Sequence, residues 1–189
     1  MDVATLRSVL EARLDSDPAP QPGPGDRLAA VLLPIVVGPE ASVVFTRRPD
    51  TLSRHPGEIS FPGGLAHAED GTLLDTAKRE TEEELGLPRD GWEILGALPP
   101  VHTFVSGILI VPFVGMLPPR PAFHPNPHEI AEVLWFSLAD LAHAEREVEY
   151  VRGDDVYRGF AYEMPGATIW GATARILHSL IEIRGGGTE

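Results

Sequence analysis

Three glutamates in the segment RETEEELGL are the residues whose types and spacing could support chemistry. An α-helix advances by about 100° per residue, so Glu80, Glu83 and Glu84 share one face. Carboxylates held together repel one another unless a cation lies between them, and such oxygen ligands favour Mg²⁺ or Mn²⁺. Since Mg²⁺ usually completes its coordination with water and substrate phosphate, the cluster indicates a metal-assisted phosphate site. The helix alone leaves open an alternative, a glutamate-rich face that only meets solvent.

A glycine turn precedes this helix and favours the metal site. The tetrapeptide FPGG, residues 61–64, follows a short strand-like stretch, and its glycines allow a tight turn that brings backbone close to a ligand. Turn and helix together resemble the Nudix box, G-x5-E-x7-R-E-U-x-E-E-x-G-U, in which U is aliphatic. The matching residues of its helical part are Arg79, Glu80, Glu83, Glu84, Gly86 and Leu87.

The sequence departs from that pattern at two places. Thr81 stands at an aliphatic position, although its methyl group can still face the core. The spacer between Gly64 and Arg79 is one residue longer than in the pattern. Counting forward from Gly64 puts the acidic position at Asp70, whereas counting back from Arg79 puts it at Gly71. The identity of the loop carboxylate therefore stays open.

The residues before the turn resemble one branch of the family, the coenzyme A pyrophosphatases. The segment VVFTRRPDTLSRHPGEISFPGG, residues 43–64, is similar to that branch's signature L-L-T-x-R-x-x-x-L-R-x-H-x-G-x-x-x-F-P-G-G. Ser53 replaces an arginine of the signature, but Arg54 is adjacent. The longer spacer before Arg79 and later stretches also look like this branch, so the resemblance covers most of residues 43–183.

This resemblance implies hydrolysis of the diphosphate of coenzyme A or an acyl-CoA to 3′,5′-ADP and 4′-phosphopantetheine. It implies Mg²⁺ (or Mn²⁺) as cofactor, held by the Gly64 carbonyl together with Glu80, Glu83 and Glu84. Arg79 is expected to orient a neighbouring carboxylate. Glu129 is the candidate general base, and Glu132 and a glutamate of the box such as Glu83 are its rivals. An exposed strand carboxylate without a catalytic role is the alternative for Glu129 and Glu132.

Four residues ahead of the glycine turn are candidates for binding the substrate, because guanidinium groups match phosphate in a forked geometry. They are Arg47, Arg48, Arg54 and His55. Surface ion pairs are the alternative for the arginines, and fixing the loop is the alternative for the histidine. Two other functions stay in play. One is a Nudix enzyme for another nucleoside diphosphate derivative, such as ADP-ribose, NADH or a dinucleotide. The other is a non-catalytic nucleotide sensor on the same fold.

Composition sets limits on partners and location. The chain has 189 residues, a net charge of -13 and no cysteine, which argues against nucleic acid as a partner and excludes disulfides and thiolate catalysis. A small anionic substrate remains compatible, because bound metal and a few arginines reverse the local potential. No secretory signal is seen, and the apolar runs are too short to span a membrane, so we expect a cytoplasmic protein. The resemblance also implies a homodimer.

The order of elements predicts an α/β protein, in which a mixed α+β sheet lies between helices as in the Nudix-type α/β/α sandwich. Residues 1–27 are expected to form a helix and a Pro/Gly-rich linker, and residues 28–185 a single Nudix hydrolase domain. Helices are expected at 4–14, 73–85, in SLADLAHAE and at 169–183. Strands are expected at 29–37, 41–47, 58–61, 92–98, 108–117, 129–136, 148–151 and 156–162.

Overall fold

The computed structural model describes residues 2–52, 55–103, 106–152 and 155–185. Within these residues eight strands form one mixed sheet in the order β3-β2-β1-β7-β5, with β4 beside β1, β6 beside β7 and β8 beside β2. Their bounds are β1 (Arg27–Val36), β2 (Ser42–Arg47), β3 (Ile59–Ser60), β4 (Gly63–Leu65), β5 (Glu93–Ala97), β6 (Val101–His102), β7 (Ile108–Leu117) and β8 (Glu132–Ser137). Strands β1 and β7 run parallel over ten residue pairs from Arg27↔Ile108 to Val36↔Leu117, and the other pairs are antiparallel.

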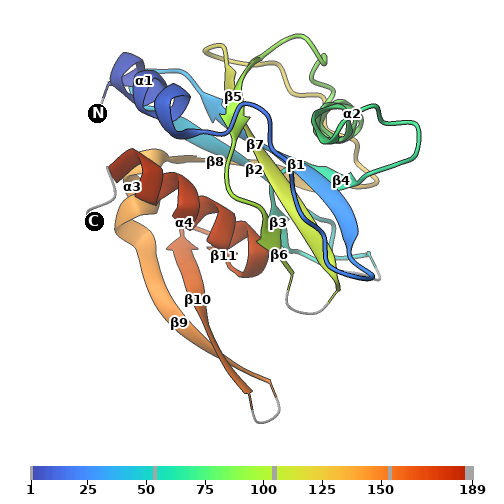
Figure 1. Cartoon of the computed structure of the whole chain (residues 1–189). Coiled ribbons are helices and arrows are strands. Elements are labelled where there is room, and N and C mark those ends of the chain that lie inside the picture. Colours follow the sequence, from blue (N-terminus) through green and yellow to red (C-terminus); the bar gives the residue numbers. More distant parts are fainter. Residues whose placement is uncertain (1, 53–54, 104–105, 153–154, 186–189) are drawn as a thin grey trace.

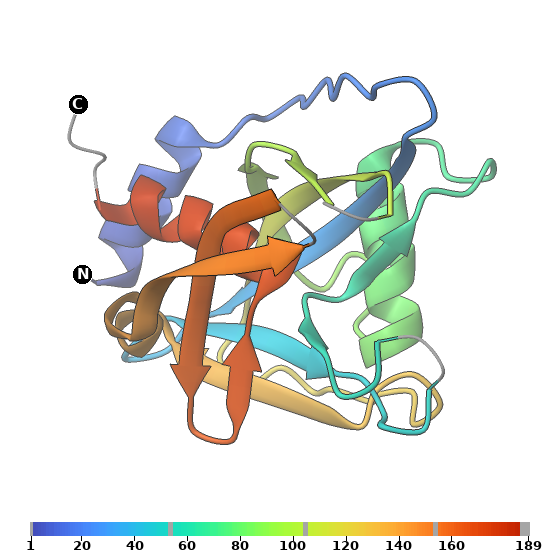
Figure 2. The same ribbon diagram turned by 90° about the horizontal axis from the view of Figure 1, so that it is seen from below.

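Helices cover both faces of this sheet (Figures 1 and 2). Helix α2 (Leu73–Leu85) packs on one face against β1, β4 and β7, while α1 (Val3–Arg13) and α4 (Gly171–Gly185) lie on the other. Strand β1 is buried on both sides, which explains its nearly continuous apolar sequence. Ala30 and Leu32 pack in the clusters on the α2 side, whereas Leu33 and Ile35 pack with α1 and α4. The predicted mixed sheet between helices is confirmed.

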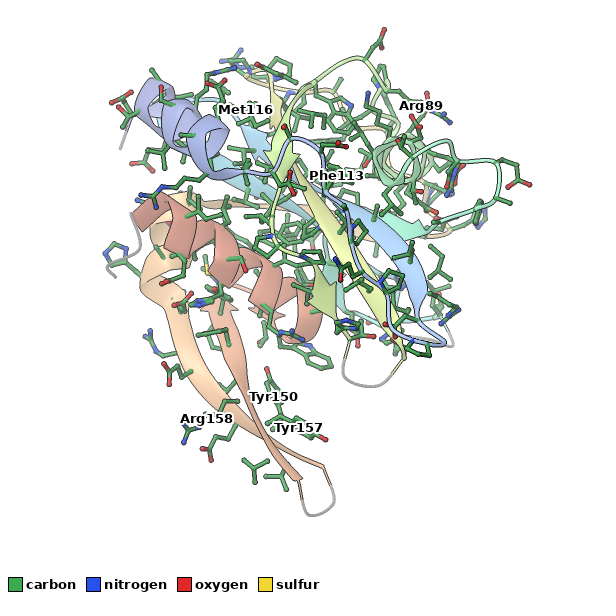
Figure 3. The ribbon with its side chains drawn as sticks, in the orientation of Figure 1. Arg89, Phe113, Met116, Tyr150, Tyr157 and Arg158 are labelled. Atoms are coloured by element: carbon green, nitrogen blue, oxygen red, sulfur yellow. The ribbon has the colours of Figure 1, made fainter. Side chains whose placement is uncertain are left out.

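A second, three-stranded sheet extends from the body of the molecule. Its strands are β9 (Glu145–Arg152), β10 (Asp155–Met164) and β11 (Ala167–Ile169), and helix α3 (Leu138–Ala144) leads into it. The β9–β10 hairpin projects outward, and Figure 3 labels Tyr150 and Tyr157, which face each other in its register. The sequence predicted the hairpin but neither β11 nor a separate sheet.

The amino-terminal helix belongs to the main hydrophobic core. Leu6, Leu10 and Leu14 are buried in the same cluster as residues of β1, β2 and α4. After a backbone bridge between Asp15 and Ala97, the chain runs to β1 without a regular element other than turns (Figure 2). The division at residue 27 stays a prediction.

Several element bounds differ from the expectation by one to three residues, and two of these differences have a clear physical reason. The strand predicted at 129–136 begins only at Glu132, because the amides of Glu129 and Ile130 donate to the Asn126 carbonyl and form a turn. The last helix begins at Gly171 instead of Ile169, because Ile169 pairs with Tyr162 in β11. Both differences come from long-range or turn contacts that periodicity does not encode.

Candidate active site

Helix α2 has the bounds that its sequence predicts, because both ends carry capping residues. The Thr72 hydroxyl accepts a bond from the Asp75 amide at 3.1 Å, and Gly86 ends the helix with φ 64°, a conformation that favours glycine. Ala77 and Thr81, on the face of α2 that packs against the sheet, are fully buried. The Thr81 hydroxyl donates to the Ala77 carbonyl at 2.7 Å, so a threonine fits the aliphatic position without an unpaired polar group.

Both glycines of the FPGG turn lie so close to neighbouring atoms that a side chain would not fit at either position. Gly63 has φ 153°, and a Cβ there would lie 2.4 Å from the Ala30 carbonyl oxygen. A Cβ on Gly64 would lie 2.5 Å from the carboxylate of Glu80. The absence of a side chain at Gly63 and Gly64 thus lets the backbone of the turn approach both β1 and the glutamate face of α2.

Arg79 donates hydrogen bonds to several carboxylates at this face of α2. Its Nε and Nη2 donate to the two carboxylate oxygens of Asp70, each at 2.9 Å. Its Nη1 donates to Glu80 at 2.7 Å and to Glu83 at 3.4 Å, and Nη2 also reaches the Leu65 carbonyl. The paired guanidinium holds the pKa of the Asp70 carboxyl well below its usual range. Asp70 therefore supplies a carboxylate in the loop before α2, and Arg79 bonds carboxylates on both sides of it, while its catalytic role stays a prediction.

Glu84 is a buried carboxylate with few partners. Its residue is 6% exposed, and among the described residues its side chain accepts one hydrogen bond, from the Gly63 amide at 3.3 Å. Burial, with the negative charge of Glu80 as the next cause, raises the pKa of Glu84 to about 8. A carboxylate in this position is stabilised by a cation close to it.

The chemistry of the donor set fits a hard divalent cation. Glu80 lies against Gly64, and Glu84 is bound to the neighbouring amide of Gly63, so both carboxylates meet the same turn. In the described part of the chain no three acidic or histidine side chains converge closely enough to hold a metal. The reason is visible in the contacts, since Arg79 holds Glu80 and Glu83 while Glu84 turns toward Gly63.

A cavity of about 200 Å³ opens beside Glu84. Gly63, Gly64 and Arg48 line it, along with residues of β1, β7 and α4. The Nε of Arg48 is buried, and no acceptor for it lies within the described residues. Arg48 also lowers the pKa of Glu84 by its charge, although this effect is smaller than that of burial. A cationic and an acidic residue thus line one cavity, and no hydrogen bond joins their side chains.

Arg47 and His55, also predicted to bind substrate, do not line this cavity. The guanidinium of Arg47 donates to Glu132 at 2.9 Å and to the Gly166 carbonyl at 2.7 Å, so it ties β2 to β8 and to the β10–β11 turn. The His55 side chain is 65% exposed, and its Nδ1 lies 2.7 Å from a carboxylate oxygen of Glu58. The backbone of His55 has φ 55°. This position agrees with the alternative in which the histidine fixes the loop. Arg54 lies outside the described residues.

The two candidate bases outside the glutamate helix lie in different elements, Glu129 in the turn before β8 and Glu132 at the start of β8. Glu132 is engaged by Arg47, whereas Glu129 lies in the turn that begins at Asn126. The Asn126 amide donates to the Glu84 carbonyl at 2.9 Å, and this bond brings the turn to the end of α2. Glu129 accordingly contributes to the raised pKa of Glu84. It is the nearer candidate to the glutamate face, a proximity that the sequence spacing alone does not reveal.

Comparison with known proteins identifies the family. The NUDIX domain matches residues 26–154. Proteins named Uncharacterized Nudix hydrolase NudL are similar to the chain: the Photorhabdus laumondii protein is 37% identical over 159 residues (83% of this chain and 84% of that protein). The Yersinia enterocolitica protein is 37% identical over 168 residues (86% of each chain).

Solved structures share the fold. A MutT/nudix family protein from Enterococcus faecalis has a TM-score of 0.52 at 17% identity, with 97% of this chain and 73% of that chain covered. A C. elegans Ap4A hydrolase has a TM-score of 0.50 at 17% identity, over 60% of this chain and 82% of that one. No helix in the described ranges is both long and apolar enough to cross a membrane. Because the NUDIX domain matches residues 26–154 and these relatives are 37% identical over most of its length, the chain belongs to the NUDIX domain family, the family of the Nudix hydrolases.

Proposed function

We propose that this Nudix hydrolase uses Mg²⁺ or Mn²⁺ to split the diphosphate of coenzyme A or an acyl-CoA into 3′,5′-ADP and (acyl-)4′-phosphopantetheine. The observation that carries the proposal is the cavity lined by both Glu84, a buried acidic residue, and Arg48, whose buried Nε has no acceptor among the described residues. A diphosphate bound with a divalent cation complements both groups at once. The upstream signature in residues 43–64 supports coenzyme A over other diphosphates.

The chain's own residues would hold the metal and the diphosphate. The Gly64 carbonyl, Glu80, Glu83 and Glu84 are the proposed metal ligands. A bound divalent cation supplies Lewis-acid polarisation of the phosphate oxygens and a more acidic water. Arg79 keeps Glu80 and Glu83 oriented through its bonds to both, and Asp70 fixes Arg79 in turn.

The reaction also needs a proton acceptor and a site for developing charge. Water adds to one phosphorus and loses a proton, the bond to the bridging oxygen breaks, and the leaving phosphate takes the electron pair. Glu129 is the proposed acceptor of that proton, because its turn is bonded to the end of α2 beside Glu84. Arg48 would donate to a non-bridging oxygen as charge accumulates there.

A substrate panel tests the proposal directly. The protein is incubated with Mg²⁺ or Mn²⁺ and with coenzyme A, acyl-CoAs, ADP-ribose and NADH, and the products are identified by mass. We expect faster turnover of coenzyme A or an acyl-CoA than of the other two. Turnover of coenzyme A no faster than that of ADP-ribose or NADH would contradict the substrate. Tight nucleotide binding without any turnover would favour a sensor.

Two variants test the placement of the site. Glu83→Gln and Glu84→Gln should each lower kcat by about two orders of magnitude or more while circular dichroism stays unchanged. Near-normal activity in both would mean that the site is misplaced.

Arg48→Gln should raise KM and lower kcat/KM, whereas Arg47→Gln should change these constants less, because the Arg47 side chain bonds Glu132. The cytoplasmic location and the homodimer stay predictions.

A further inference from the structure

The cavity beside Glu84 has mainly aliphatic walls. Val31 of β1, Leu65 of β4, and Ile108 and Ile110 of β7 line it on the side of the sheet. Ala172 and Ile176 of α4 line it from the opposite side. Metal and phosphate chemistry does not require such a surface, because phosphate oxygens bind cations and polar donors. Aliphatic walls of this kind therefore suit an uncharged group better than a phosphate.

The cavity offers little for the recognition of a nucleobase. Bases are typically bound by stacking on aromatic faces and by hydrogen bonds to their edges. Among the described residues that line the cavity, Phe61 is the aromatic one, and it is 3% exposed and stacked on Phe45 at 4.9 Å. The Ser60 hydroxyl is already within 3.3 Å of the Thr46 hydroxyl. These walls suit an uncharged chain better than a flat polar ring.

Helix α4 is a firmly held wall. Arg175 donates to the His102 carbonyl at 2.6 Å, which ties the helix to β6. His178 stacks on Phe160 with centroids 3.6 Å apart, and its Nδ1 lies 3.1 Å from Glu145. Ala174 and Leu177, on the inward face of α4, are fully buried. A wall fixed in this way selects by size instead of yielding to each ligand.

The wall also lies outside the part of the chain that defines the family. The NUDIX match ends at residue 154, whereas α4 spans Gly171–Gly185. Helix α4 is thus not part of the segment that carries the glutamate helix and matches the NUDIX domain. This is the position expected of a residue that sets substrate choice and takes no part in the chemistry.

From these observations we propose that the cavity is the subsite for the uncharged chain attached to the diphosphate, with its width set by Ala172, Thr173 and Ile176. The inference rests on the proposed function, because the diphosphate must lie between Glu84 and Arg48 for the chain to enter. In coenzyme A this chain is the pantetheine arm. The adenine nucleotide then lies on the other side of the diphosphate, outside the cavity.

Direct binding of the two products tests the orientation without turnover. Titration calorimetry with Mg²⁺ present compares 4′-phosphopantetheine, which carries the chain, with 3′,5′-ADP, which does not. Ala172→Phe should fill the cavity and weaken 4′-phosphopantetheine binding by about tenfold or more, while 3′,5′-ADP binding changes by less than about twofold. Glu182→Phe places the same ring on an exposed position of α4 and is the matched control, with both affinities unchanged.

A smaller variant and the wild-type reaction make each outcome decisive. Ala172→Val replaces Ala172→Phe as the test if the phenylalanine variant unfolds. Because valine adds less volume, this variant should weaken 4′-phosphopantetheine binding by a smaller factor. Unchanged binding of both products in a folded Ala172→Phe variant overturns the inference. Selective loss of 3′,5′-ADP binding also overturns it, since the chain would then lie elsewhere. Coenzyme A hydrolysis by the wild type is measured in the same preparation, so failure of the proposed function is seen separately.

Discussion

Removing the buried charge at position 84 should make the metal-free protein more stable at alkaline pH while abolishing its activity. Glu84 is 6% exposed, and burial together with Glu80 raises its pKa to about 8. Glu84→Gln keeps the shape of the side chain and a neutral group at every pH. The variant therefore escapes the cost of ionising a carboxylate in this position.

The sign and size follow from the raised pKa. An unfolded glutamate titrates near pH 4.3, so between about pH 4.3 and pH 8 the folded wild type binds more protons than the unfolded chain. Its free energy of unfolding then falls as the pH rises through this window. Each pKa unit is worth about 1.4 kcal/mol, so the advantage of Glu84→Gln should grow by at most about 4 kcal/mol from pH 5 to pH 8.5.

Urea unfolding with EDTA at pH 5 and pH 8.5 measures this difference. Glu82→Gln is the matched control, because Glu82 is exposed on the same helix and pairs with Arg89 on the surface, at 2.7 Å. Its effect should stay within about 1 kcal/mol at both values. A stability gap between wild type and Glu84→Gln that does not widen with pH would refute the reasoning. Added Mg²⁺ should stabilise the wild type more at pH 8.5 than at pH 5, because its ligands must be deprotonated.

Three further variants test the scaffold of the site. Asp70→Asn removes the negative partner of the Arg79 guanidinium and should lower the free energy of unfolding by about 1–3 kcal/mol, measured in urea, with a fall in kcat. Gly64→Ala brings a methyl group to 2.5 Å from the Glu80 carboxylate and should lower kcat by about tenfold or more, whereas Gly185→Ala, with open space around it, should have no effect. Leu10→Ala should cost about 2–5 kcal/mol of stability, because this fully buried side chain of α1 fills the main core. A cost below about 1 kcal/mol would mean that α1 is not firmly docked in solution.

Local signals account for the parts of the fold that the sequence predicts well. Helix α2 was predicted with its observed ends, because Thr72 and Gly86 supply caps and the buried stripe repeats at helical spacing. Strand β7 also has the predicted bounds, since an apolar run between turns describes a buried strand. By contrast, the two-residue β6 and the three-residue β4 and β11 are too short for a periodic pattern, and only their partner strands define them.

The sequence by itself determined the glutamate face and the glycine turn, because both depend on the spacing of residues a few positions apart. Only the tertiary structure decided that Asp70 pairs with Arg79, since Asp70 lies in an irregular segment before α2 whose path has no fixed period. It also separated Arg48, which lines the cavity, from Arg47, which bonds Glu132 on β8. Adjacent residues at the end of a strand point to different neighbours, and those neighbours come from distant parts of the chain. The aliphatic wall of α4 lies more than eighty residues from Glu84 in the sequence, and the packing of the helix on the sheet alone brings the two to one cavity.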